Sequence, residues 1–264
     1  MYLDYWNLEK FPFENVADPS FFYVSQSHEE ALSRLLYASR LSKGAAMLTG
    51  DIGCGKTLIS RVYKNKVKEA GAEISLLTNP PYNPIEFLQT ILYQQGIGDP
   101  PDSKARLLQM LGRKMVQNLE NSKGTIIVID EAQGLPEETF EEARLLLNFQ
   151  NNHRFLLTLV LIGQPELRSK IKHMKPFDQR IPIRFHIHPF GFVDTIKYIM
   201  FRERKAGFEK NIFTKDAIRK IYEYTGGLPR KINSVCDLSL LIAYNKKRKI
   251  INPAIIDSVI EDLE

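Results

Sequence analysis

The chain has 264 residues, a formal net charge of +5 and a pI near 9.0, with the apolar and charged fractions of an ordinary globular protein. No apolar stretch approaches the roughly 18 residues of a membrane span, and the first residues lack the layout of a signal peptide. We therefore expect a soluble cytoplasmic protein without a membrane span, which only a protein partner would bring to the inner membrane.

Five short apolar runs predict buried strands, because they are rich in Ile, Val and Leu and end at polar or Gly residues. They cover residues 45–49, 73–77, 125–130, 155–163 and 183–188. Helical patterns lie between them, at 58–70, 84–95, 103–120, 137–149 and 166–173. Strands that alternate with helices predict an α/β fold with a parallel sheet.

The pattern changes on either side of this region. After Pro189 four helices are expected, at 192–205, 214–225, 229–245 and 253–263, with Thr214 at a helix start and Gly226-Gly227 at a helix stop. An aromatic and proline-bearing lead-in opens the chain. A helix at 27–41 follows it, where Ser27 and Glu30 have the spacing of a capping box.

The stretch "TGDIGCGKT" contains the pattern G-x-x-x-x-G-K-[ST] at residues 50–57, between a predicted strand and a predicted helix. Glycines allow a tight turn whose N–H groups point at phosphate, and the following helix adds its positive end. Lys56 is expected to reach the β- and γ-phosphates, and Thr57 to bind Mg²⁺.

The stretch "TIIVIDEAQ" is an apolar strand that ends in two acids. Asp130 is predicted to bind Mg²⁺, and Glu131 to deprotonate a water that attacks the γ-phosphate. A base beside the metal ligand favours hydrolysis over a small-molecule kinase, and no N-K-x-D signature of a GTPase is present.

Four further polar or charged residues are candidates for the site. Gln164, at the end of the strand in "LVLIGQPEL", could hold the attacking water or cap the strand. Arg180 or Arg184 could reach a neighbouring subunit's site as an arginine finger, or lie on the surface. Arg230, in the first turn of a helix after "GGLP", could report the state of the nucleotide.

These pieces, in this order, resemble the AAA+ ATPases, with Gln164 at the sensor 1 position, Arg180 at the arginine finger and Arg230 at sensor 2. A narrower resemblance, carried by "YWNLEKFPF", "LTGDIGCGKT", "VIDEAQ", "LIGQPEL" and "TGGLPRKIN", is to ExeA-type (general secretion pathway protein A) ATPases, which are similar to ATPases of transposition systems. Members of that type often add a transmembrane helix and a peptidoglycan-binding domain, and the 264 residues contain neither.

The resemblance implies a P-loop fold with a five-stranded parallel sheet and a C-terminal helical lid. It divides the chain into a lead-in and helix at 1–41 as part of the ATPase module, a core at 42–190 and a lid at 191–264. It implies ATP and Mg²⁺ as ligands. The nucleotide-binding residues would be Gly50, Asp51, Ile52, Gly53, Cys54, Gly55, Lys56, Thr57, Leu58 and Arg230.

The leading hypothesis is an ATP hydrolase that assembles around ATP into a ring, such as a hexamer, and serves a secretion, pilus or export machine. The alternative is an ATP-gated DNA-binding matchmaker. Two basic stretches could then line a pore: Arg168, Lys170, Lys172 and Lys175, and Lys246, Lys247, Arg248 and Lys249. A scaffold that binds nucleotide without hydrolysis is a third hypothesis, and the intact Lys56, Thr57, Asp130 and Glu131 argue against it.

Overall fold

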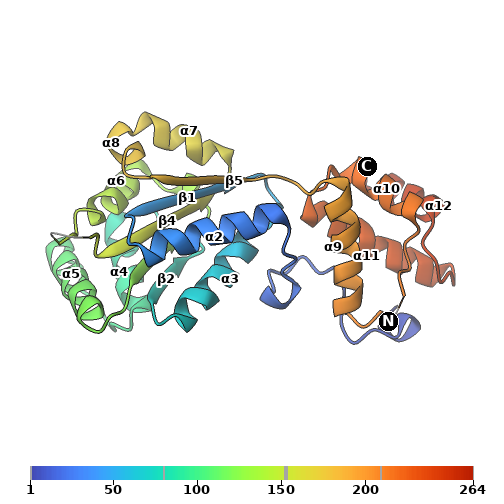
Figure 1. The fold of residues 1–264 in the computed structure, drawn as a ribbon, viewed down its shortest axis with the longest axis horizontal. Helices are drawn as coiled ribbons and strands as arrows, with labels where there is room; N and C mark the ends of the chain where they lie inside the picture. Colours follow the sequence, from blue (N-terminus) through green and yellow to red (C-terminus); the bar gives the residue numbers. More distant parts are fainter. Residues whose placement is uncertain (1, 80, 152–153, 209, 264) are drawn as a thin grey trace. The chain divides into compact units, whose positions relative to one another are not determined.

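The computed structural model describes residues 2–79, 81–151, 154–208 and 210–263, which divide into two compact units (Figure 1). The sheet unit contains Gln26–Asp51 and Lys56–Ile187. The helical unit contains residues 2–25, Ile52–Gly55 and 188–263. The lead-in and the four C-terminal helices thus belong to one unit, together with four residues of the phosphate loop.

The sheet unit has the predicted five strands. They are β1 (Ala45–Gly50), β2 (Glu73–Leu77), β3 (Thr125–Ile129), β4 (Leu157–Gly163) and β5 (Ile183–Ile187). All pairs are parallel, in the order β2-β3-β4-β1-β5. Because parallel strands end at one edge of a sheet, the residues after β1, β3 and β4 are brought together there.

Helices cover both faces of the sheet, which explains why β1, β3 and β4 are buried and almost continuously apolar (Figure 1). One face packs on α4 (Pro84–Gln94), α5 (Lys104–Glu120), α6 (Glu137–Leu146), α7 (Pro165–His173) and α8 (Lys175–Asp178). Met47, Ile127 and Leu159 point into this core, where they meet residues such as Phe140. The other face packs on α2 (Gln26–Arg40) and α3 (Lys56–Glu69).

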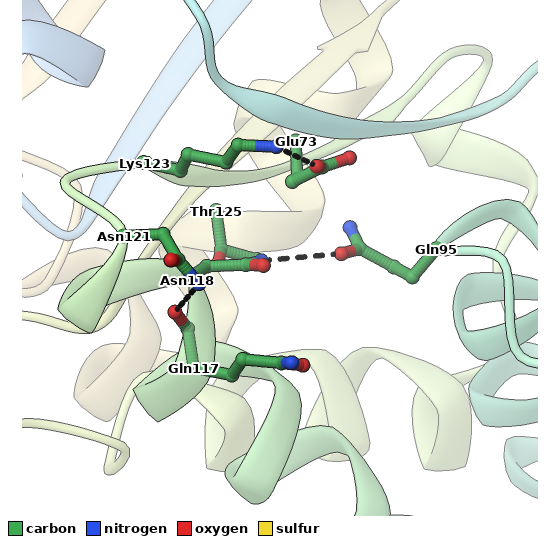
Figure 2. A network of polar contacts seen from close by, with 7 residues as sticks. All are labelled: Glu73, Gln95, Gln117, Asn118, Asn121, Lys123 and Thr125. Carbon is green, nitrogen blue, oxygen red and sulfur yellow. Dashed lines mark hydrogen bonds and ion pairs between the residues drawn. The ribbon is translucent and has the colours of Figure 1, made fainter.

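A polar network ties β2 and the start of β3 to the ends of α4 and α5, and Figure 2 shows Gln95, Asn118 and Thr125 of this network. The buried Asn118 amide donates to Thr125 Oγ1 at 2.9 Å and to Gln95 Oε1 at 3.4 Å. Gln95 in turn donates to Ser75 Oγ at 3.1 Å. Because buried polar atoms are costly without partners, this network fixes the register of both helices. The network lies at the sheet edge where the strands begin, opposite the edge where the strands end. It therefore supports the fold and is not part of the expected site.

The helical unit contains α1 (Tyr2–Trp6), η1 (Pro19–Phe21), α9 (Phe192–Lys205), α10 (Lys215–Thr225), α11 (Pro229–Asn245) and α12 (Pro253–Leu263). The lead-in is held by long-range contacts. Trp6 Nε1 donates to Leu240 O at 3.3 Å, and the buried Arg202 guanidinium donates to Glu14 O at 2.9 Å. Thr214 caps α10, accepting from Ala217 N at 3.2 Å, and α10 stops at Gly226, as predicted.

Some local predictions differ from the structure. The capping box is wrong: α2 begins at Gln26, so Ser27 lies inside its first turn, and the buried Ser27 Oγ has no hydrogen-bond partner among the described residues. The helix predicted at 137–149 ends at Leu146. The short α1, α8 and η2 (Ala132–Gly134) were not expected. Across the described ranges, no helix combines the length and apolar character that a membrane crossing needs.

Candidate nucleotide site

The phosphate loop follows β1 and leads into α3, as its pattern predicts. Lys56 begins α3, and its buried ammonium donates to the carbonyl oxygens of Gly50 at 2.8 Å and Asp51 at 3.0 Å. Gly53 and Gly55 have φ values of +86° and +88°, a backbone region that glycine tolerates. The N-terminal end of α3 and a buried cation therefore converge on one loop, which suits an anion.

Other expected nucleotide-binding residues differ in exposure. Cys54 is fully buried, Ile52 is 62% exposed at the loop tip, and Leu58 is half-buried in the first turn of α3. Among the lead-in aromatics, Phe13 lies in the core of the helical unit. The structure thus assigns Phe13 to packing.

Arg230 contacts the phosphate loop within the helical unit. It lies in the first turn of α11, and its backbone N–H donates to Gly53 O at 3.2 Å. A Cβ on Gly53 would stand 2.8 Å from Arg230 Cβ, closer than carbon atoms approach. The Asn15 amide donates to Ser234 Oγ at 3.2 Å and to Arg230 O at 3.4 Å, which anchors this turn of α11.

The two expected Mg²⁺ ligands are adjacent. Asp130 directly follows β3 and is 1% exposed, and burial raises its carboxyl pKa. The Thr57 hydroxyl hydrogen-bonds to the Asp130 carboxylate and opposes that rise. A hydroxyl and a carboxylate fit Mg²⁺, which prefers oxygen ligands and takes few from protein when phosphates and waters supply the rest.

Two side-chain amides hold the carboxylate of Glu131. Gln133 Nε2 donates to Glu131 Oε2 at 2.6 Å, and Gln164 Nε2 donates to the same oxygen at 3.2 Å. Gln164 therefore joins the site from the end of β4, beside the proposed base. Gln133 was not assigned a role from sequence. Its only signal is its place in "DEAQ", two residues after Glu131.

Lys170 is half-buried beside this site. Its ammonium donates to the carbonyl oxygens of Gln133, at 3.2 Å, and of Leu135, and it lies 4.7 Å from the centre of the Phe140 ring. Burial lowers its pKa. Lys170 is therefore engaged within its own chain, whereas its neighbours Arg168 and Lys172 are exposed. That this basic stretch lines a DNA pore stays a prediction.

Both candidate finger residues hydrogen-bond to groups of their own chain. Arg184 is tied to its own chain, with Nη1 donating to Asp178 Oδ1 at 2.7 Å and Nε to Ile181 O at 3.0 Å. Arg180 lies just before β5, where Nη1 donates to Asn148 Oδ1 at 2.6 Å. This position is at the edge where strands begin, opposite the phosphate loop of the same subunit.

Similarity to known proteins shows the family of this chain. A profile described as an AAA domain matches residues 39–171, half of the chain. The chain belongs to this AAA domain family. It is 33% identical over 247 residues to General secretion pathway protein A of Aeromonas hydrophila. The aligned region covers 92% of this chain and 45% of that protein.

A second relative is ATP-dependent target DNA activator B of Escherichia phage Mu, 30% identical over 156 residues, covering 58% of this chain and 45% of that protein. The chain thus spans less than half the length of either relative. Among solved structures, ORC2 of Aeropyrum pernix, in ADPNP–ADP complexes, has a TM-score of 0.73 at 16% identity, covering 97% of this chain and 72% of that one. This likeness shows the P-loop AAA+ fold predicted from the sequence.

Proposed function

We propose that this AAA domain protein binds ATP with Mg²⁺ and hydrolyses the γ-phosphate with water as the nucleophile. The observation that carries the proposal is the convergence after three neighbouring strands. Lys56 follows β1, Asp130 and Glu131 follow β3, and Gln164 follows β4. A cation, a metal-ligand pair and a carboxylate held by amides are the parts that phosphoryl transfer to water requires.

Each residue has a defined part in the proposed reaction. Lys56, which now bonds two loop carbonyls, would exchange them for phosphate oxygens. Thr57 and Asp130 would hold Mg²⁺, which neutralises charge on the phosphates when bound. Glu131 would take the proton of the attacking water, and Gln164 would orient Glu131 or that water. Arg230 would contribute to nucleotide binding from the helical unit.

Steady-state ATP turnover and ATP binding by two variants test the proposal. Lys56→Ala should abolish ATP binding, whereas Lys68→Ala, an exposed lysine on the same helix, should not change it. Glu131→Gln should keep ATP bound and reduce turnover by about a thousandfold, because the amide cannot accept the proton. Unchanged turnover in Glu131→Gln would remove Glu131 as the base.

We also propose that ATP binding drives assembly of a ring, with Arg180 entering a neighbour's site, and that the ring serves a secretion-type machine at a membrane complex. The placement of Arg180 away from its own phosphate loop supports action between subunits. The relative named General secretion pathway protein A supports the pathway. Mass in solution with and without a slowly hydrolysed ATP analogue tests assembly, which should require the analogue.

Binding to DNA is a second candidate function. The turn between α11 and α12 exposes Lys246, Lys247, Arg248 and Lys249 in succession. Lys249 also lies over the Tyr5 ring, 3.4 Å from its centre, beside Tyr244. An exposed run of cations with aromatic neighbours suits a phosphate backbone, and one relative is named a target DNA activator.

Duplex binding with ATP present, measured across salt concentrations, tests this alternative. We expect a steep fall in affinity as salt rises, because each phosphate contact releases counterions. Replacing Lys246, Lys247 and Arg248 by Ala should lower both the affinity and the salt slope, by about 0.9 in log–log slope per lost contact. No detectable binding at low salt would reject DNA as the ligand.

A further inference from the structure

The backbone of Glu131 is strained. Its φ of 52° and ψ of 37° place it in the left-handed region, which costs a non-glycine residue about 1–3 kcal/mol. Such a conformation persists only where the surroundings hold it. The residues that surround Glu131 therefore determine where its carboxylate points.

The two ends of the Gln133 amide connect Glu131 to Gln164. Its Nε2 donates to Glu131 Oε2 at 2.6 Å, and its Oε1 accepts the backbone N–H of Gln164 at 3.1 Å. The amide thus bridges the turn after β3 to the end of β4. Gln164 Nε2 binds the same carboxylate oxygen at 3.2 Å, so Glu131 Oε1 takes neither of these two hydrogen bonds.

Gly163 supplies the space that Gln133 occupies. A Cβ at position 163 would stand 2.5 Å from Gln133 Oε1 and 2.9 Å from Leu167 Cδ2. Any larger residue at the end of β4 would therefore push the Gln133 amide out of its bridge. The last residue of β4 and the side chain of Gln133 fit each other.

Lys170 fixes the backbone beneath this bridge. By donating to Gln133 O and Leu135 O from α7, it secures the turn whose side chain binds Glu131. Both the main chain and the side chain of Gln133 are thus anchored to the segment around β4 and α7. A flexible surface glutamine would have neither anchor.

We propose that Gln133 is a positioning residue for Glu131: it keeps Oε2 occupied and leaves Oε1 to receive the proton of the attacking water. The inference rests on the proposed function, because it assumes that Glu131 is the base. Gln133 donates a hydrogen bond to a group that reacts. The loss of this hydrogen bond should therefore reduce kcat and leave ATP affinity unchanged.

Two substitutions at Gln133 separate positioning from packing. Gln133→Ala removes both hydrogen bonds. Gln133→Glu keeps the volume and the acceptor for Gln164 N–H but replaces the donor to Glu131 with a like charge. We expect kcat to fall by about 10- to 100-fold in both, the range that misplacing a reacting group by about an ångström can cause. The KM for ATP of Gln133→Ala should stay near the parent value, as should kcat, KM and the melting temperature of the exposed control Gln109→Ala.

Gly163→Ala provides an independent route to the same defect. In the parent chain it should lower kcat, because the added methyl displaces the Gln133 amide. In a chain that already carries Gln133→Ala, the same change should lower kcat much less, since no amide remains to be displaced. This non-additivity is the signature of residues that act as a unit.

The outcomes distinguish this inference from the proposed function. If Glu131→Gln stops turnover while both Gln133 variants keep the parent kcat, Glu131 remains the base and the positioning role is rejected. A Gln133→Glu variant with full activity, or additive effects of Gly163→Ala and Gln133→Ala, would also overturn it. If Glu131→Gln binds ATP and turns it over normally, the proposed function itself fails.

Discussion

At the scale of single residues, two features of position 53 exclude a side chain. Its φ of +86° is costly for other residues, and a Cβ would collide with Arg230 Cβ at 2.8 Å. We expect Gly53→Ala to weaken ATP binding by about tenfold or more, because the turn that points loop N–H groups at phosphate would shift. Titration with a fluorescent ATP analogue measures the affinity.

Gly71→Ala is a matched control for this change. Gly71 has nearly the same φ, +83°, but a Cβ there would meet nothing within 4 Å. Gly71→Ala should therefore lower the free energy of unfolding by about 1–2 kcal/mol through backbone strain alone, and it should leave ATP affinity unchanged. Equal ATP affinities for the two variants would show that the Gly53 turn is not part of the nucleotide site.

Residues of the site differ in how far sequence could predict them. Lys56 and Thr57 form a contiguous pattern, and Asp130 and Glu131 end an obvious strand, so local sequence was sufficient to place them at the ends of β1 and β3. Their roles stay a prediction. Gln133 was missed because one of its two side-chain partners, Gln164, follows β4, and only the adjacency of β3 and β4 brings it within reach. The left-handed backbone of Glu131 has no local signal either, since glutamate has no preference for it.

At the scale of elements, α9 carries a buried acid that should make stability depend on pH. Glu203 is 1% exposed; its Oε1 accepts from Ile212 N at 3.1 Å, and Oε2 has no partner among the described residues. Burial, opposed by the nearby Arg204 and by backbone donors, raises its pKa from 4.5 to about 7. The folded protein therefore holds a proton that the unfolded chain releases at a lower pH.

The sign of the effect follows from that difference in bound protons. Between pH 4.5 and about 7 the folded state binds more protons, so the free energy of unfolding falls as pH rises, by up to about 3 kcal/mol from this group. Glu203→Gln keeps an acceptor for Ile212 N–H and cannot ionise. We expect it to be more stable than the parent at pH 8 and similar to it near pH 4.5.

Chemical denaturation at several pH values between 4.5 and 8 measures this difference. The informative quantity is the variant minus the parent, because other groups titrate in both chains and cancel. A difference that stays constant across this range would mean that Glu203 is ionised in the folded state. Thr214→Ala, which removes the cap of α10, serves as a control that lowers stability by about 1 kcal/mol without a pH trend.

Prediction of the elements succeeded where burial alone decides the structure. The strands were found within two residues at each end, because runs such as Ile126–Ile129 can only be buried. The capping box at Ser27 failed because a spacing of polar residues does not fix where a helix begins. The lead-in gave no sign that it packs on α9 and α11, since those contacts join residues about 190 to 235 positions apart.

At the scale of the whole molecule, the location of Arg180 bears on how an active site is completed. Arg180 precedes β5, at the strand-start edge of the sheet, while Lys56 and Glu131 lie at the strand-end edge. A guanidinium there is held on its own subunit by Asn148 at 2.6 Å. In a head-to-tail ring this edge of one subunit would face the nucleotide of the next, which is the arrangement an arginine finger needs.

A mixing experiment tests this arrangement. Arg180→Ala and Glu131→Gln should each lose ATP turnover by about a thousandfold or more, with ATP affinity of the monomer intact. In an equal mixture, some interfaces combine Glu131 of the Arg180→Ala chain with Arg180 of the Glu131→Gln chain. If such sites are complete, turnover should recover to about a quarter of the parent value, since one in four random pairings has both groups.

The control mixture combines Arg180→Ala with Lys56→Ala. Lys56→Ala keeps Arg180 but cannot bind ATP, so an Arg180→Ala subunit next to it still has a complete site, and turnover should recover as well. By contrast, Arg113→Ala, an exposed arginine on α5, should be fully active alone. Absence of recovery in both mixtures, under conditions where the ATP analogue drives assembly, would place Arg180 outside the site of the neighbouring subunit. Recovery in both would show that every active site is shared between two chains, so that a lone subunit can bind ATP but cannot turn it over efficiently.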